Sequence, residues 1–515
     1  MRKVIASLTG ACCASTALLA GFQTSEPAYL NGTPSGNYTF KPLVSVGDRV
    51  PLTGGAPTDS YAFVGIPDAM GLYKDPVTSE NILFVAHELG NTLTTEPLPG
   101  QTKFKGSFVS RYVLADDATV TSAGVAHQEL YLENVFYNPT PPKDGTAIRG
   151  FNRYCSGSFA GTAHGMDRPI FFANEESSGG FDQAKGELSV AIVDGKMHTL
   201  PALGRVAREN TIVMPRRDAL TAIVSTEDSG YPSYVFLYVG TKQRRSESAL
   251  DKNGLTSGKI YVLGGKGADA NKNEASFTAG TIQSRWIEIP NAAALSSAQL
   301  KTAAGTAGGF GFVRVEDGEF DPLAPTRSFF VASTGGSAPN TLGRLYKLNF
   351  NPANPAADGT LDIVYNAASI VTPGGNINAG QDWPCSVDNI AVTADRIVIC
   401  EDLNSPASAV FSKYGRNGGV WTLDRNNNYA AKYQGDFNFT YANARDNTTR
   451  SRGQWEASGV VDASTIFGEG SFIINVQAHG TRTNIPNPAG GNYTTSQANS
   501  LFAEDGQLLL MTLKP

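Results

Sequence analysis

The chain has 515 residues, enough to bury a large core, and its 41 Lys and Arg against 47 Asp and Glu leave no basic surplus for binding nucleic acid. Charged residues are only 17%, whereas Gly (55) and Pro (28) are frequent, which argues against long exposed helices and predicts many turns. We therefore expect an all-β protein.

The N-terminal segment is typical of an export signal. Arg2 and Lys3 precede an apolar stretch and small residues around Ala20. We predict that residues 1–25 are a cleaved signal and that the protein is periplasmic or secreted. A membrane anchor is the alternative, but the stretch is short and no later run approaches the roughly 18 apolar residues that cross a bilayer. No stable membrane association is expected.

Short apolar runs recur through the rest of the chain. Six of them are "NILFVAHE", "RPIFFANEE", "LTAIVSTED", "RSFFVASTGG", "DRIVICED" and "SFIINVQAH". Each has the length of a strand, and many are followed by a half-buried alternating pattern such as "GKIYVLGG" or "GGVWTLDRNN". Units of four strands around an axis form a β-propeller. We predict a six- or seven-bladed propeller filling residues 26–515 as one domain.

The insertions are fewer and mostly irregular. "NAAALSSAQLKTAAG" predicts a helix, whereas "SALDKNGLTSG" and "IPNPAGGNYTTSQANS" predict loops. Three cysteines follow the signal. Cys385 and Cys400 are the natural disulfide pair in an oxidising compartment, which leaves Cys155 as the thiol to be explained.

Acidic residues follow the apolar runs. The strand ends read His87-Glu88, Glu175-Glu176, Glu227-Asp228, Glu316-Asp317 and Glu401-Asp402, with Asp388, Asn389 and Glu456 near neighbouring strand starts. In a propeller such ends converge on the central channel. Converging carboxylates repel one another unless cations compensate them, so the pattern predicts bound metal. Oxygen ligands suit calcium, and a thiolate among them would call for a transition metal as well.

Several of these segments carry a resemblance to a known family. They are "VAHELG", "CSGSFAG" with "FFANEES", "GRVARENTIV" with "IVSTEDSGYPSYVFLYVG", "FVRVEDGEFDP", "CSVDNIAV" and "VQAHG". In this order the chain resembles the PhoX-type alkaline phosphatases, secreted β-propeller phosphoesterases that use iron and calcium. The resemblance implies a thiolate–iron bond for Cys155, and carboxylate ligation by Glu209, Glu316 and Asp388.

The remaining site residues follow from the same matching. The neighbouring acids, Glu88, Glu175, Glu176 and Asp228, would hold calcium, and manganese or another divalent metal could stand in place of iron. Arg153 and Arg314 would clamp phosphate oxygens, and His479 would protonate the leaving alkoxide. Arg208 stands where the family has a His, and a fixed cation there could replace one metal. Purely structural roles for Cys155, His479 and the two arginines remain as alternatives.

The sequence therefore predicts a metal-dependent phosphomonoesterase that releases inorganic phosphate from small-molecule phosphate esters and acts as a monomer. One alternative is a propeller phosphodiesterase or phosphotriesterase with a binuclear metal centre. Another is a calcium-binding propeller without catalysis. The sequence contains no serine nucleophile elbow and no phosphate-binding Walker loop.

Overall fold

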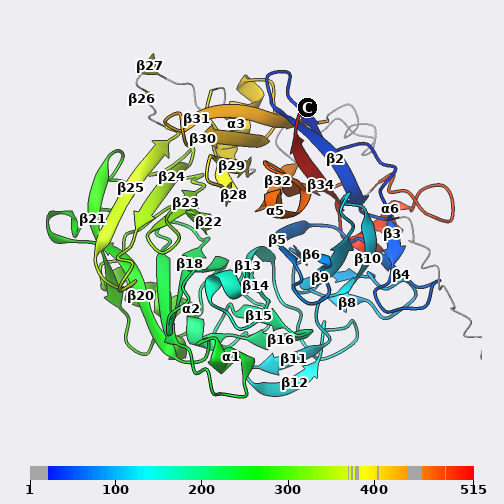
Figure 1. The fold of residues 1–515 in the computed structure, drawn as a ribbon, viewed down its shortest axis with the longest axis horizontal. Coiled ribbons are helices and arrows are strands. Elements are labelled where there is room, and N and C mark those ends of the chain that lie inside the picture. The colour runs from blue at the N-terminus through cyan, green and yellow to red at the C-terminus, as the bar shows by residue number, and fades with distance from the viewer. Residues whose placement is uncertain are drawn as a thin grey trace, which may run out of the picture.

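A computed structural model describes residues 21–368, 371–372, 375–376, 382–402, 405–438, 455–481 and 483–515. Most of the predicted export signal, residues 1–20, lies outside them. In the described part of the chain the strands form six four-stranded blades arranged in a ring (Figure 1). This confirms the predicted all-β propeller.

The first three blades come from the N-terminal half of the chain. Blade 1 contains β5 (Pro67–Lys74), β6 (Asn81–His87), β9 (Phe108–Leu114) and β10 (Val120–Val125). Blade 2 contains β13 (Tyr154–Ala160), β14 (Ile170–Glu175), β15 (Ser189–Val193) and β16 (Lys196–Thr199), extended by β11 (Glu129–Leu132) and β12 (Val135–Pro139). Blade 3 contains β17 (Arg208–Val213), β18 (Leu220–Glu227), β19 (Val235–Thr241) and β20 (Gly258–Gly265), extended by β21 (Thr281–Glu288).

The other three blades complete the ring. Blade 4 contains β22 (Val315–Phe320), β23 (Ser328–Ser333), β24 (Arg344–Asn349) and β25 (Gly359–Asn366). Blade 5 contains β28 (Val387–Val392), β29 (Arg396–Glu401), β30 (Val420–Asp424) and β31 (Ala430–Phe437), with β1 (Leu30–Gly32) at its edge. Blade 6 contains β32 (Glu456–Asp462), β33 (Phe472–Ala478), β34 (Asp505–Leu513) and β2 (Tyr38–Ser45). Its outer strand β2 comes from near the N-terminus and lies beside β34 in Figure 1.

Smaller elements lie in the loops that connect the strands. Three two-stranded ladders join β3 (Arg49–Pro51) to β4 (Ser60–Ala62), β7 (Thr94–Thr95) to β8 (Phe104–Lys105), and β26 (Val371–Thr372) to β27 (Gly375–Asn376). The α-helices of the described residues are α1 (Ala249–Lys252), α2 (Ser297–Thr306), α3 (Ser405–Lys413), α5 (Ser464–Phe467) and α6 (Thr495–Phe502). Within the described ranges no helix is both long and apolar enough to cross a membrane.

The six apolar runs of the sequence are the second strands of the six blades, β6, β14, β18, β23, β29 and β33. Each of these strands is buried on both faces. In β14, Ile170 and Phe172 pack toward blade 3, whereas Phe171 and Ala173 pack toward blade 1. A strand packed on both faces needs apolar residues at successive positions. This packing explains why the runs are continuous rather than alternating.

Three expectations about local structure are wrong. Residues 248–258 contain the one-turn helix α1, and residues 485–500 run into α6, which begins with a capping box between Thr494 and Gln497. Cys385 and Cys400 are free thiols rather than a disulfide. The two thiols belong to different core clusters on opposite faces of blade 5. Cys385 packs in the same cluster as Ile399, whereas Cys400, the next residue of β29, points to the other face. The predicted helix is confirmed as α2.

Blade 5 depends on a buried ion pair. Arg416 donates to both carboxylate oxygens of Glu401, at 2.6 and 2.9 Å, and the two side chains are 7% and 0% exposed. The same carboxylate accepts from the backbone N–H groups of Cys385 and Gly419. These bonds hold the loops at the end of β29.

Removing this arginine should be costly. Arg416→Met leaves a buried carboxylate without its cation, so we expect the free energy of unfolding to fall by about 3–5 kcal/mol in a urea titration. Arg168→Met is the control, because Arg168 pairs with acids at the surface and an exposed pair is worth about 0–1 kcal/mol. An equal, small loss in both variants would contradict the proposed role of Arg416.

Candidate metal centre

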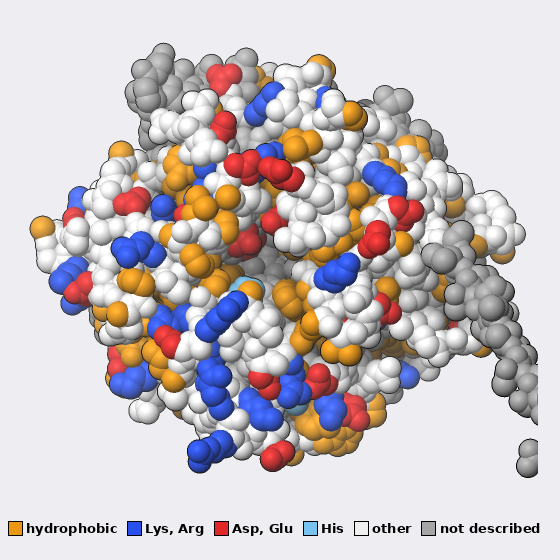
Figure 2. All heavy atoms as spheres, in the orientation of Figure 1, with side chains coloured by type: hydrophobic (Ala, Val, Ile, Leu, Met, Phe, Trp, Pro, Cys, Tyr) orange, Lys and Arg blue, Asp and Glu red, His pale blue; other side chains and the backbone are white. Residues whose placement is uncertain are grey.

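The innermost strands of the six blades meet around one central channel. β5, β13, β17, β22, β28 and β32 contact one another in this order, and β32 returns to β5. Figure 2 shows that the face it displays is hollowed at the centre of the ring, with acidic side chains in the hollow. A cavity of about 250 Å³ lies among the innermost strands, with Asp317 and Asn389 in its lining.

Each innermost strand carries a β-bulge at the same place. The register with the second strand shifts directly after the pairs Pro67–His87, Tyr154–Glu175, Arg208–Glu227, Val315–Ser333, Val387–Glu401 and Ala457–Val476. A bulge inserts one residue and re-aims the local side chains. The bulged residues next to these pairs are Asp68, Cys155, Glu209, Glu316, Asp388 and Ser458.

The backbone leading into four of these strands has an unusual conformation. Ile66, Arg153, Arg314 and Ser386 all have φ between 51° and 55°. Each stands two residues before one of the bulged residues. A left-handed conformation in a residue other than glycine costs about 1–3 kcal/mol and concentrates at functional sites. These four turns therefore fix the point at which each of the four innermost strands enters the channel.

The second strands supply the other half of the site through their alternation. The residues that follow the same six pairs are Glu88, Glu176, Asp228, Thr334, Asp402 and Gln477. The residue before each of them points the other way. Glu175, for example, accepts hydrogen bonds from the backbone N–H groups of Asn152, Phe181 and Leu188. The dipeptides Glu175-Glu176, Glu227-Asp228 and Glu401-Asp402 thus each divide into a loop anchor and a channel residue.

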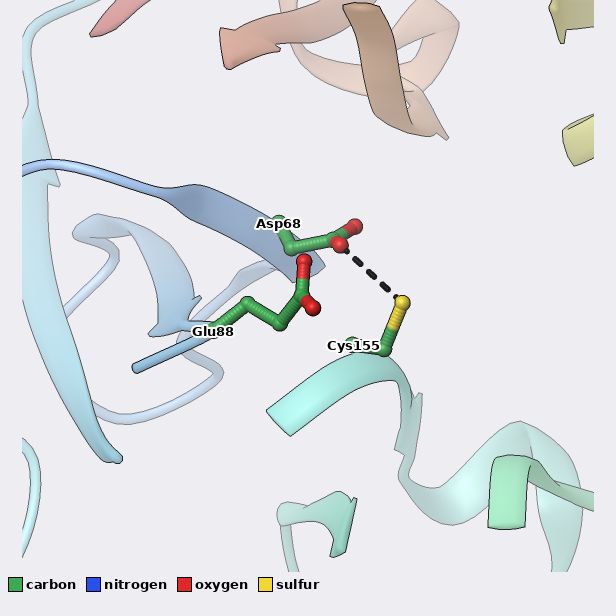
Figure 3. Close-up of side chains that lie close together, drawn as sticks. All are labelled: Asp68, Glu88 and Cys155. Atoms are coloured by element: carbon green, nitrogen blue, oxygen red, sulfur yellow. Dashed lines mark hydrogen bonds between the residues drawn. The ribbon is translucent and has the colours of Figure 1, made fainter. Parts of the chain in front are cut away.

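The channel residues gather into four groups whose ligand atoms lie within 4.8 Å of one another. These groups are Asp68–Glu88–Cys155, Glu176–Glu209–Asp228, Glu209–Glu316–Asp388 and Asp388–Asp402–Glu456. Glu209 and Asp388 each belong to two groups, so the last three form one continuous cluster. Figure 3 shows the first group, in which the Cys155 thiol donates to Asp68 at 3.3 Å and Glu88 points to the same space.

Burial and mutual repulsion dominate the electrostatics of these groups. The pKa of Asp68 is raised well above its usual value by burial and then by Glu88. Burial also raises the pKa values of Glu209 and Asp388. Among their charged neighbours, Glu316 makes the largest further contribution to both. The pKa of the Cys155 thiol is raised by burial and then by Asp68. Burial and neighbouring acids therefore favour the protonated forms of Asp68, Glu209, Asp388 and Cys155.

The donor set fits bound cations. Both oxygens of Glu209 and one oxygen of Asp388 are buried without a hydrogen-bond partner. Buried polar atoms normally have partners, so buried carboxylate oxygens without one are candidate ligands for a cation. Carboxylate oxygens suit calcium, and the sulfur of Cys155 beside two carboxylates suits a transition metal.

Two arginines of the chain compensate part of the charge. The Arg314 guanidinium lies 3.1 Å from Asp228, 2.8 Å from Glu316 and 2.5 Å from Asp402. Arg153 lies 2.9 Å from Glu88, and its side chain is 53% exposed. Arg153 therefore binds the channel residue Glu88 and is also accessible to solvent.

Arg208 does not enter the channel. Its guanidinium is fully buried and donates to Ser189 at 2.6 Å and to the carbonyl of Leu203 at 3.0 Å. Arg208 pairs with Glu227 directly before the bulge. Because successive side chains of a strand point to opposite faces, Arg208 points away from the side of Glu209, into the space between blades 2 and 3. The expectation that this cation could replace a metal is therefore not met.

His479 lies at the edge of the fourth group. Its Nδ1 is 3.1 Å from Glu504, and its Nε2 is 3.6 Å from Glu456. Burial lowers the pKa of His479, but the contacts with Glu456 and Glu504 outweigh this effect and hold the pKa well above its usual value. The two carboxylates therefore favour the protonated form of the imidazole.

The structure brings together most residues that the sequence predicts for the site. Cys155, Glu88, Glu176, Glu209, Asp228, Glu316 and Asp388 all belong to the four groups. Glu175 lies outside them. The sequence pattern places Asp402 and Glu456 among the converging acids without assigning them as ligands, and the predicted site does not include Asp68. Asp68 could have been found by spacing, because it precedes Glu88 by about 20 residues, as Cys155 precedes Glu176 and Glu209 precedes Asp228.

Comparison with solved structures identifies a protein of the same architecture. Pseudomonas fluorescens PhoX in complex with vanadate, a transition state analogue, superposes with a TM-score of 0.63 at 13% identity, covering 96% of this chain and 97% of that chain. The NanB sialidase from Streptococcus pneumoniae covers 88% of this chain and 69% of its own at 8% identity, but its TM-score of 0.31 is too low to support a shared fold. No curated protein matches the sequence.

Comparison with family models is more specific. The model described as alkaline phosphatase PhoX matches residues 193–480, more than half of the chain. The matched range includes Glu209, Glu316 and Asp388, and it also contains Arg314 and His479. Asp68, Glu88 and Cys155 precede it and join the site through the fold. The chain therefore belongs to the PhoX alkaline phosphatase family and is a phosphoric ester hydrolase.

Proposed function

We propose that the protein is a metal-dependent phosphomonoesterase that releases inorganic phosphate from small-molecule esters outside the cytoplasm. The observation that carries the proposal is the continuous cluster of buried carboxylates in which Glu209 and Asp388 are shared. Calcium and iron are the proposed cations, with manganese or another divalent metal in place of iron. We also propose that residues 1–25 are an export signal and that residues 26–515 act as one monomeric domain.

The proposed roles follow from position and chemistry. Cys155, with Asp68 and Glu88, would hold the transition metal, and the carboxylates of the other three groups would hold calcium. When bound, such cations neutralise the charge of a phosphoryl group. The exposed end of Arg153 would orient phosphate oxygens through its planar guanidinium, and Arg314 would hold the acids from blades 3, 4 and 5 in place. His479, kept protonated, would donate a proton to the leaving group.

Preference for monoesters rests on the cationic groups at the site. A monoester dianion has one more negative charge than the matching diester. The side chain of Arg153 is half-exposed while it binds Glu88, so its remaining N–H groups would donate to those oxygens. The alternatives of a diesterase or triesterase have no observation in their favour, and family membership argues against a purely structural propeller.

Arg153→Ala tests this function. Because hydrogen bonds to charged groups contribute about 1.5–3 kcal/mol, we expect kcat/KM for an aryl phosphate monoester to fall about 10- to 100-fold. The loss for the matching diester should be smaller. Arg149→Ala is the control, since Arg149 is an exposed arginine of the same loop. If wild-type protein cleaves the diester faster than the monoester, the proposed substrate class is incorrect.

A further inference from the structure

A second set of polar side chains lies next to the channel residues. These side chains belong to the residues that directly follow the proposed ligands, among them Ser156, Asn210, Asp317 and Asn389. All four line the 250 Å³ cavity, and they are 2–7% exposed. Asn389 donates to Ser156 at 2.9 Å, which links blade 5 to blade 2. The set therefore connects innermost strands that share no backbone ladder.

Asp317 makes the most extensive of these connections. Its Oδ1 accepts from the Asn210 side-chain amide at 2.6 Å and from the backbone N–H of Gly318 at 2.6 Å. Its Oδ2 accepts from the backbone N–H of Ile390 at 3.1 Å. One carboxylate on β22 thus ties β17 on one side and β28 on the other. Blades 3, 4 and 5 are joined at this single residue.

The three strands joined by Asp317 are those that carry one group of acids. Glu209 directly precedes Asn210, Glu316 directly precedes Asp317, and Asp388 stands two residues before Ile390. These three acids form the fully buried group whose oxygen atoms lie within 4.8 Å. The spacing between β17, β22 and β28 therefore sets the spacing of the three carboxylates. A shift of one strand would open the group.

We propose that Asp317 and Asn210 are positioning residues that hold Glu209, Glu316 and Asp388 as one cation site. This inference rests on the proposed function, in which that group binds a cation. Neither side chain needs to touch the cation, since each acts on the strand that bears a ligand. Partners that orient metal ligands without contacting the metal commonly change affinity about 10- to 100-fold when replaced.

The decisive variant is Asn210→Ala, because it cuts the link between β17 and β22 without changing any charge. Asp317→Asn removes the acceptor that faces Ile390 and also removes a charge. The double variant tests whether the two residues act as a unit. Asp321→Asn is the matched control. Asp321 is 2% exposed, follows the far end of β22 and pairs with Arg425, but it contacts none of the three acids.

The measurements are cation content per folded molecule and Ca²⁺ affinity by calorimetric titration, with circular dichroism to confirm folding. We expect Asn210→Ala to weaken one class of Ca²⁺ sites about 10- to 100-fold, with activity regained at high Ca²⁺. The double variant, which loses both links, should bind Ca²⁺ more weakly than either single variant, and Asp321→Asn should bind like the wild type.

The other outcomes are distinguishable. Wild-type Ca²⁺ affinity in Asn210→Ala would overturn the inference. This holds even if Asp317→Asn binds Ca²⁺ more weakly, because the lost charge of Asp317 would then explain the effect. An equal loss in Asp321→Asn would also overturn it, because general destabilisation would then suffice. A wild-type protein that binds no cation would refute the proposed metal dependence itself.

Discussion

Chelation of the purified protein should abolish phosphatase activity and lower the melting temperature together. Each cation that binds only the folded state stabilises it by about 2.7 kcal/mol when its free concentration is 100 times Kd. Removing the cations also leaves Glu209 and Asp388 buried with unpartnered oxygens beside Glu316. Calorimetry before and after dialysis against a strong chelator measures the effect.

The control for chelation is the same chelator saturated before use with both Ca²⁺ and the transition metal found in the protein, which should leave both properties unchanged. Restoring Ca²⁺ alone should recover the melting temperature more fully than the activity, because the thiol group of the site calls for a second kind of metal. Full activity and an unchanged melting temperature after verified metal removal would disprove metal dependence.

Cys155→Ser should reduce turnover of an aryl phosphate monoester by at least about 100-fold. Replacing a residue that only orients a metal ligand reduces activity by up to about 100-fold, and loss of the ligand itself should cost at least as much. A serine hydroxyl is a far poorer ligand at neutral pH than a cysteine sulfur. The variant should lose transition metal per folded molecule while keeping calcium. Elemental analysis of the folded fraction measures both.

Cys400→Ser is a suitable comparison for this variant. Cys400 is a fully buried free thiol in the apolar cluster between blades 5 and 6. Serine there should cost about 1–3 kcal/mol of stability through an unsatisfied hydroxyl, with metal content intact. If Cys155→Ser behaves in the same way as Cys400→Ser, Cys155 is a packing residue rather than a ligand.

The propeller could be predicted because its strongest sequence pattern has a single physical cause. The second strand of each blade packs against both neighbouring blades, so six apolar runs stand out in the sequence. The first strands were harder to see. β5 and β13 begin at positive-φ turns and contain bulges, which interrupt the period of two that identifies a strand.

The same interruption limited the prediction of the site. Glu88 and Glu176 follow continuous apolar runs and were found, whereas Asp68 follows Pro67 at the start of a bulged strand and was missed. Glu175 was included because a dipeptide does not reveal which side chain faces the channel. Only the register with the first strand, set by the pair Tyr154–Glu175, assigns Glu175 to the loop and Glu176 to the site.

The closure of the ring has a consequence for the order of folding. β2 pairs with β34, and the Tyr29 hydroxyl donates to Asp505 across 476 residues of chain. Contacts between such distant residues carry a large loop-closure entropy and slow the final folding step. Because blade 6 contributes Glu456 to the group with Asp388 and Asp402, that group is complete only after the last strand has been made. A chain still emerging from the ribosome therefore lacks this finished group, so a cation held by these three acids would bind only after synthesis.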